Sequence, residues 1–220
     1  MPRKRKRHDD RGSLAAAHLV PRSFFNRDPR VVARALLGKL IVRRRGRSLL
    51  AGRIVEVEAY LGADDLAAHA AAGRTARNSV LFGPPGHAYV YFIYGMYYCL
   101  NFSCLPDGVA GGVLIRALEP VAGLEEMARA RGLDFNSESV RDLRSLTSGP
   151  GRLCEAFGIT RSRDNAKDAV SRRSDLQVME DNYKPGKVAV TPRVGIVKSA
   201  SLQLRYVIAE NPFVSTRAVV

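Results

Sequence analysis

Residues Arg53–Tyr98 read RIVEVEAYLGADDLAAHAAAGRTARNSVLFGPPGHAYVYFIYGMYY. In the first eight of them, two acids alternate with aliphatic side chains in a run that ends at Tyr60, a period of two that is typical of a β-strand. The middle part, residues 61–86, is rich in glycine and shows no clear helical or strand period. The last part contains five tyrosines, a residue type that favours strands. We therefore expect two strand regions joined by an irregular segment.

Gly95 divides the tyrosine-rich part into two strands, and the pattern predicts a β-hairpin made of His87–Tyr94 and Tyr97–Phe102. Tyr94 stands beside the turn glycine and is expected to be exposed. An exposed, rigid aromatic ring at a hairpin tip is suited to enter a DNA minor groove and to unstack a base step. Tyr91 points to the opposite face and is placed to stack on an extruded base.

The sequence around this stretch predicts one α+β domain, residues 14–220, with a mostly antiparallel sheet. A helix is expected between the cap residue Asp28 and Gly38, since Pro29 suits a first helical turn. Residues 159–174 are polar and are expected to form a loop. Further helices are expected at Asp64–Ala70, Leu124–Ala130, Ser137–Leu146 and Gly151–Phe157, and strands at Lys39–Arg44, Leu49–Tyr60, Gly112–Leu118, Val188–Val197 and Leu204–Ile208.

The charge of the chain points to a polyanionic partner. The 220 residues carry a net charge of +14, and +9 is left after the five charges of Arg3–Arg7 are subtracted. A basic body of this kind favours nucleic acid binding. Residues 1–13 are expected to form a disordered basic tail, which either tethers DNA or directs nuclear import, or has no defined role.

The cysteines indicate a reducing compartment. The three of them, Cys99, Cys104 and Cys154, are odd in number and lack the CxxC spacing. We expect them to be reduced and buried, and we expect no zinc site, since the four histidines and these thiols are too scattered to supply its ligands. No apolar run of 18 residues or more occurs, so no membrane span is expected. The expected compartment is the cytoplasm with its nucleoid in a prokaryote, or the nucleus in a eukaryote.

Two carboxylates mark the end of the first strand region. The period of two places Glu56, Glu58 and Tyr60 on one face of the strand, while Val55 and its apolar neighbours face the core. The period cannot choose between the two glutamates as a catalytic acid. The alternative is a solvated strand face that forms salt bridges with the many arginines.

Other polar residues could complete a nucleic acid site. Arg74, Arg77 and Asn78 follow His69 and are placed to receive phosphates at a loop tip, although ordinary surface charge explains them equally well. Asn101 has an amide that can both donate and accept, as reading a purine edge requires. Arg116 interrupts an apolar run and is either paired inside or directed at DNA.

Four segments of the chain together resemble a known family. They are GRIVEVEAYLGADDLAAHAAAGRTARN, GHAYVYFIYGMYYCLN, VLIRALEP and SGPGRLCEAFGI. These segments closely resemble the alkyladenine DNA glycosylases, also called 3-methyladenine or methylpurine DNA glycosylases of the mammalian type. The likeness extends from about Phe24 to the C-terminus and excludes the basic tail.

The resemblance implies a compact domain with a curved, mostly antiparallel sheet, surrounding helices and a protruding hairpin that inserts into DNA. It implies base-excision repair of damaged double-stranded DNA by a monomer that needs no cofactor and has no lyase activity. Alkylated or deaminated purines are flipped out and hydrolysed from the sugar, which leaves an abasic site. The roles implied are water activation by Glu58 with Arg116 nearby, base binding by Tyr60, His69, Tyr91 and Asn101, intercalation by Tyr94, and DNA backbone contacts by Arg74, Arg77 and Asn78.

The aromatic residues of such a pocket are expected to favour cationic alkylated bases through cation–π stacking. Two rival functions stay open at this point. A damage-sensing protein without catalysis would use the same pocket and would not need Glu58. A glycosylase with lyase activity would use Pro2 as an amine nucleophile after removal of the first methionine.

Overall fold

The sheet is built around one long strand, β3 (Ser48–Tyr60). The computed structural model describes residues 14–136 and 139–216. Strand β6 (Gly112–Ala122) pairs with β3 along one edge. On the other edge, β2 (Leu40–Arg45) pairs with the first half of β3, and β9 (Arg205–Ile208) pairs with residues 56–58. The C-terminal half of β3 therefore has a neighbour on both sides, which buries the residues that it carries.

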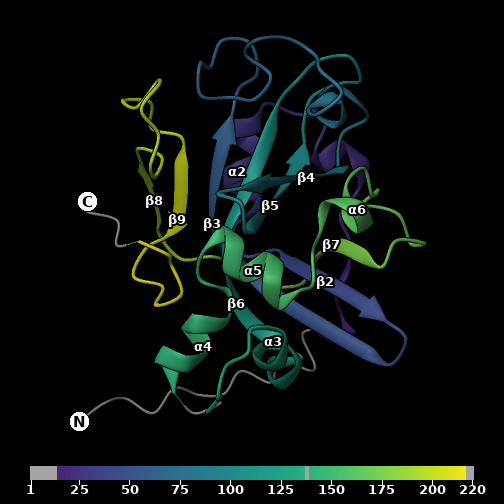
Figure 1. Cartoon of the computed structure of the whole chain (residues 1–220), viewed down its shortest axis with the longest axis vertical. Coiled ribbons are helices and arrows are strands. Elements are labelled where there is room, and N and C mark those ends of the chain that lie inside the picture. Colours follow the sequence, from purple (N-terminus) through teal and green to yellow (C-terminus); the bar gives the residue numbers. More distant parts are fainter. Residues whose placement is uncertain (1–13, 137–138, 217–220) are drawn as a thin grey trace.

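The strands form one antiparallel sheet in the order β1-β7-β2-β3-β6-β5-β4, with β9 attached to β3 and β8 attached to β9. The sheet curls around its core (Figure 1). The structure therefore confirms the predicted α+β class and the curved antiparallel sheet. The remaining strands are β1 (His18–Leu19), β4 (Ala88–Ile93), β5 (Tyr97–Ser103), β7 (Leu176–Glu180) and β8 (Val188–Thr191).

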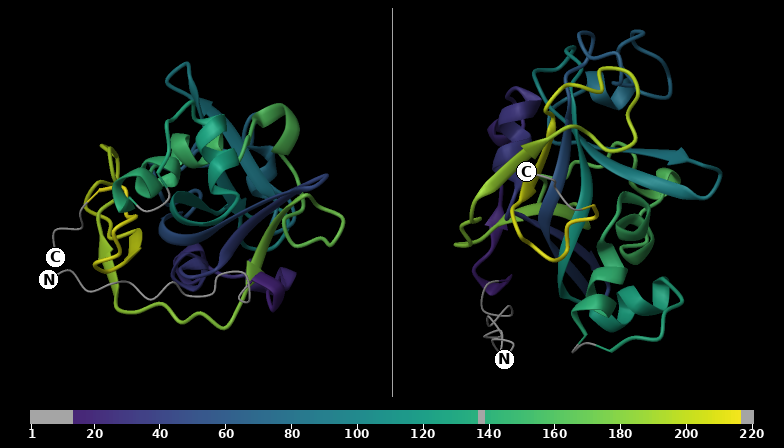
Figure 2. Two further views of the ribbon diagram at one scale, coloured as in Figure 1. Left: turned by 90° about the horizontal axis from the view of Figure 1, so that it is seen from below. Right: turned by 90° about the vertical axis from the view of Figure 1, so that its left-hand side faces the viewer.

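Helices cover both faces of the sheet. Helix α2 (Pro29–Leu36) packs against β3 and β6, and the Asp28 side chain caps it by accepting a hydrogen bond from the backbone N–H of Arg30. Helix α5 (Pro150–Ala156) packs against β5 and β6 and lies on the opposite side of the sheet from α2 (Figure 2). The other helices are η1 (Arg22–Phe24), η2 (Ser79–Phe82), α3 (Leu124–Ala130), α4 (Val140–Thr147) and α6 (Arg161–Asp164).

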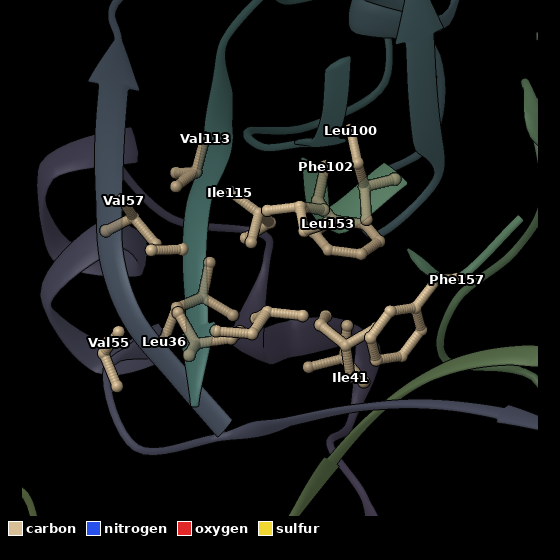
Figure 3. Packing of buried hydrophobic residues seen from close by; sticks show 14 of the residues in the cluster. Leu36, Ile41, Val55, Val57, Leu100, Phe102, Val113, Ile115, Leu153 and Phe157 are labelled. Carbon is tan, nitrogen blue, oxygen red and sulfur yellow. The ribbon is translucent and has the colours of Figure 1, made fainter. Parts of the chain in front are cut away.

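The main core lies between the sheet and these helices. Figure 3 shows side chains from α2, β2, β3, β5, β6 and α5 in this cluster, among them Leu36, Val57, Ile115 and Leu153. Val55, Val57 and Ala59 are fully buried, as the period of two predicts. This packing fixes the ends of β3, β4 and β5. These strand ends carry several residues of the candidate site.

The predicted elements are largely confirmed, with a few clear errors. The helix predicted at Asp64–Ala70 is a series of turns, because the Asp65 side chain accepts hydrogen bonds from the backbone N–H groups of Leu61 and Ala67. The strand predicted to reach Val197 ends at Thr191, just before Pro192. Strands β1 and β7 and helices η1, η2 and α6 have no counterpart among the predicted elements, and α6 lies within the loop predicted at residues 159–174. The part of the helix predicted at residues 137–138, the basic tail 1–13 and residues 217–220 lie outside the described residues.

No helix in the described part of the chain is long and apolar enough to cross a membrane. The three cysteines are free and buried, as expected.

Gly62 is required where the chain leaves β3. Its φ is +88°, and a Cβ atom there would lie 2.2 Å from the backbone oxygen of Ala110. Gly73, on the same loop, has a φ of +92° but open space around a Cβ. We predict that Gly62→Ala lowers the free energy of unfolding by at least about 1 kcal/mol more than Gly73→Ala, since only the first adds a clash to the backbone strain. Urea unfolding of both variants measures this, and equal losses would contradict the steric explanation.

Candidate active site

A cavity of about 140 Å³ opens where β3, β4, β5 and the loop 61–78 meet. Its walls combine aromatic rings with a few polar groups, which is typical of a ligand site. The structure thus brings together Tyr60, His69, Tyr91 and Asn101, the four residues that the sequence selected for base binding. The lining residues that matter here are Tyr60, His69, Tyr89, Tyr91, Asn101 and Ile196.

Three rings form one aromatic cluster in this cavity. The His69 and Tyr91 rings meet edge to face with centroids 4.5 Å apart, and the Tyr89 and Tyr91 centroids are 5.6 Å apart. His69 Nδ1 also lies 2.9 Å from the Tyr89 hydroxyl. Burial and the nearby charge of Arg77 lower the pKa of His69, which favours its neutral form.

Tyr60 connects the cavity to a buried carboxylate. Its hydroxyl donates a hydrogen bond of 3.0 Å to Oε2 of Glu58. Burial, with the adjacent charge of Glu58, raises the pKa of Tyr60, so this hydroxyl stays protonated and remains a donor. Glu58 does not itself line the cavity and lies one hydrogen bond behind it.

Glu56 is surrounded by partners. Its Oε1 accepts from Arg116 Nε at 2.9 Å, from Arg205 Nε at 2.8 Å and from the Ser215 hydroxyl at 2.9 Å. Its Oε2 accepts from the Ser215 backbone N–H at 2.6 Å. The side chain is fully buried in the sheet. Glu56 therefore acts as an anchor that joins β3, β6, β9 and the C-terminal segment.

Glu58 has fewer partners than Glu56. Its Oε1 accepts from the backbone N–H of Val194 at 2.8 Å and lies 3.3 Å from Arg116 Nη1. Among the described residues, its Oε2 accepts only from Tyr60, although a carboxylate oxygen has room for a second donor. The position for a second donor is therefore on Oε2, the oxygen that accepts from Tyr60, and Tyr60 lines the cavity. The predicted solvated strand face is wrong, because both glutamates are buried, but the predicted pairing with arginines is confirmed.

Arg116 is paired inside the protein and bridges the two carboxylates. Burial opposes its charge, but Glu58 and Glu56 outweigh this effect and raise the pKa of Arg116 above its usual value. Its guanidinium therefore stays charged and balances part of the negative charge of both glutamates.

A second buried ion pair lies beside Tyr60 and was not identified from the sequence. Arg193 donates to both oxygens of Asp65, at 2.5 and 2.8 Å, and to the backbone oxygen of Ala59 at 3.1 Å. Its guanidinium carbon lies 4.6 Å from the centroid of the Tyr60 ring. This pair ties the loop that carries His69 to the segment that supplies the Val194 N–H. No local sequence signal indicates it, because the two residues are 128 positions apart in the chain.

The loop 73–78 separates the three residues that were expected to contact phosphates. Arg74 and Arg77 are exposed, and Arg77 lies 6.0 Å from the Tyr91 ring centroid. Asn78 is buried, and its amide donates to the backbone oxygens of His69 and Gly73 at 2.8 and 2.9 Å. The Asn78 side chain thus shapes the loop from inside, and only the two arginines reach the surface.

The hairpin β4–β5 extends away from the body of the protein (Figure 2). Tyr94 is 83% exposed at its turn, with a φ of +53°. Met96 beside it is also exposed. Asn101, at the base of the hairpin, donates 3.2 Å to the backbone oxygen of Tyr89, and this bond fixes its amide at the cavity wall. Within the described ranges, no group of three or more His, Cys, Asp or Glu side chains could hold a metal ion.

The two glutamates should differ in their contribution to stability. We predict that Glu56→Gln lowers the free energy of unfolding by about 3–5 kcal/mol, since it breaks a buried network that includes two arginines. Glu58→Gln should cost clearly less, because Arg116 keeps Glu56 as its partner. Urea unfolding compares the two variants, and a larger loss for Glu58→Gln would contradict the assignment of Glu56 as the anchor.

Comparison with known proteins relates this geometry to one family. The family model described as Methylpurine-DNA glycosylase matches residues 23–212. A protein of Koribacter versatilis, provisionally named a 3-methyladenine DNA glycosylase, is 63% identical over 93% of this chain and 97% of its own length. Proteins with the same provisional name from Burkholderia cenocepacia and Methanocella arvoryzae are 48% and 44% identical, over 90% and 91% of this chain and over 91% and 97% of their own lengths.

Proposed function

This chain belongs to the methylpurine-DNA glycosylase family. We propose that it removes damaged purines from duplex DNA by hydrolysing the bond between base and sugar, with Glu58 activating the attacking water. The target nucleotide rotates out of the duplex, and its base enters the cavity lined by Tyr60, His69 and Tyr91. An aromatic cavity suits a purine ring because stacking holds the base without reading one particular edge.

The acceptor position left on Glu58 Oε2 carries this proposal. A water molecule bound there would lie next to Tyr60 and therefore at the cavity. Cleavage of a purine N-glycosidic bond develops positive charge on the sugar, and an adjacent carboxylate both stabilises that charge and accepts a proton from the attacking water. Oε2 of Glu56 also accepts one bond, but from the Ser215 backbone N–H, which does not line the cavity, and three donors bind its Oε1.

Arg116 keeps Glu58 ready for this step. The guanidinium lies 3.3 Å from Oε1, and the Val194 N–H binds the same oxygen. Both contacts hold Oε1 in place, and Oε2 keeps its hydrogen bond from Tyr60. We assign Arg116 to the support of Glu58 and not to direct contact with the base.

The other residues bind DNA around the cavity. Tyr94 fills the space that the rotated nucleotide leaves, and Arg74 and Arg77 bind phosphates near the cavity mouth. Asn101 contacts the edge of the bound purine. Asn78 acts indirectly, because its hydrogen bond to the His69 backbone sets the position of that residue. The protein acts as a monomer in this proposal.

Glu58→Gln tests the catalytic step. The amide cannot accept a proton from water, so we predict that base release from a hypoxanthine duplex falls by at least about a thousandfold, the usual scale for loss of a general base. Binding to the same duplex should change little. Asp64→Asn is the matched control, since it makes the same chemical change on an exposed loop residue. Release by Glu58→Gln at the control rate would show that another group activates water.

Tyr94→Ser tests the wedge. We predict that binding to a lesion duplex weakens about tenfold or more, since one stacking ring is worth about 1–3 kcal/mol. Binding to the same lesion in a single strand should change much less. Val31→Ser removes an exposed apolar side chain from α2, away from the hairpin, and should leave both affinities unchanged. Equal losses on duplex and single strand would argue against intercalation.

Hydrolysis without strand cleavage distinguishes this proposal from the two rival functions. A protein that only senses damage would bind lesion DNA and produce no abasic sites. A lyase that uses an amine would form a covalent adduct that borohydride traps. We expect abasic sites to accumulate and no adduct to be trapped.

A further inference from the structure

The ring of Tyr60 already has a cation stacked on it. The Arg193 guanidinium carbon is 4.6 Å from the ring centroid, and the Arg193 side chain is almost completely buried. Tyr60 lines the cavity whereas Arg193 does not, so the guanidinium covers the side of the ring that faces away from the cavity. A base that enters the cavity therefore stacks on a ring whose other face is occupied.

This cation is fixed in place and stays charged. Asp65 binds the guanidinium through both oxygens, and the backbone oxygen of Ala59 accepts a third bond. Asp65 is itself held by the N–H groups of Leu61 and Ala67. Burial opposes both charges, yet the mutual interaction outweighs it: the pKa of Asp65 is lowered and the pKa of Arg193 is raised.

A cation on one face of an aromatic ring changes what the other face can bind. The ring attracts a cation through the negative potential of its faces. A guanidinium on the rear face weakens the attraction of the ring for a cation on the front face, and it also repels a second positive charge across the ring. A neutral base carries no net charge, so this repulsion does not weaken its stacking on the ring. Arg77, 6.0 Å from the Tyr91 ring centroid, adds positive charge on another wall of the cavity.

We propose that Arg193 is a specificity-determining residue, which acts through Tyr60 to shift the preference of the pocket from cationic alkylated purines toward neutral purine lesions. This inference rests on the proposed function, since it concerns the substrates of the same cavity. It differs from the expectation that the aromatic pocket favours cationic bases. Asp65 limits the effect, because its negative charge cancels part of the field of Arg193.

Because Asp65 and Arg193 oppose each other, their variants should change specificity in opposite directions. Asp65→Asn leaves the arginine without its counter-charge, while the amide oxygen can still accept one of the two loop N–H groups. The double variant Asp65→Asn/Arg193→Met removes both charges and leaves no buried ion unpaired. Arg193→Lys keeps the charge. A purely structural brace would affect release of all bases alike.

The experiment measures single-turnover release of 7-methylguanine, a cationic base, and of hypoxanthine, a neutral base, from otherwise identical duplexes at one pH. The quantity compared is the ratio of the two rates. We predict that the double variant raises the ratio of cationic to neutral release by about threefold to tenfold, the range that one cation–π contact can supply. Asp65→Asn should lower the ratio, and Arg193→Lys should keep it near the wild-type value.

Arg74→Met is the matched control, since it removes a positive charge from the exposed loop and has no described ring contact. It should slow release of both bases equally.

Where one base is released too slowly to measure, the ratio of dissociation constants for the two duplexes in the Glu58→Gln background replaces the ratio of release rates. An unchanged ratio in the double variant, or a change of the same sign in both Asp65→Asn and the double variant, overturns the inference. A wild-type protein that releases neither base would instead refute the proposed function.

Discussion

Two carboxylates that stand two residues apart on a buried strand share one arginine, and the rest of the site depends on this arrangement. Glu56 and Glu58 would repel each other strongly in the sheet without a counter-charge. Arg116 comes from the neighbouring strand β6 and lies within 2.9 Å of one carboxylate and 3.3 Å of the other. The strand pairing that buries the glutamates therefore also supplies the charge that makes their burial possible.

The partners of the two glutamates then give them different roles. Arg205 and Ser215 complete the bonding of Glu56 and tie the C-terminal segment to the sheet. In the part of the chain that the structure describes, the second oxygen of Glu58 accepts a hydrogen bond from Tyr60 alone, and Tyr60 lines the cavity. Arg193, behind the Tyr60 ring, also has two roles. Its buried ion pair with Asp65 braces the loop, and its charge alters the electrostatics of the ring. Structure and chemistry are coupled here through a small number of fixed charges.

Much of the fold could be predicted from local patterns, whereas the roles within the site could not. Asp28 and Pro29 specify the start of α2, and Gly95 with its flanking tyrosines specifies the hairpin, because these signals act over a few residues. The choice between Glu56 and Glu58 depends on Arg205, Ser215 and the Val194 N–H, which are far away in the sequence. The family resemblance supplied that choice, and the period of two alone left it open. The same distance explains why the Asp65–Arg193 pair was missed and why Asn78 was expected at the surface.

The most direct test of the central claim is a crystal structure of the Glu58→Gln variant bound to a duplex that contains hypoxanthine. The account predicts that the hypoxanthine lies in the cavity against Tyr60 and Tyr91, with the side chain of residue 58 facing the sugar and an ordered water between them. A duplex with the base still stacked, or a base bound elsewhere on the protein, would contradict it.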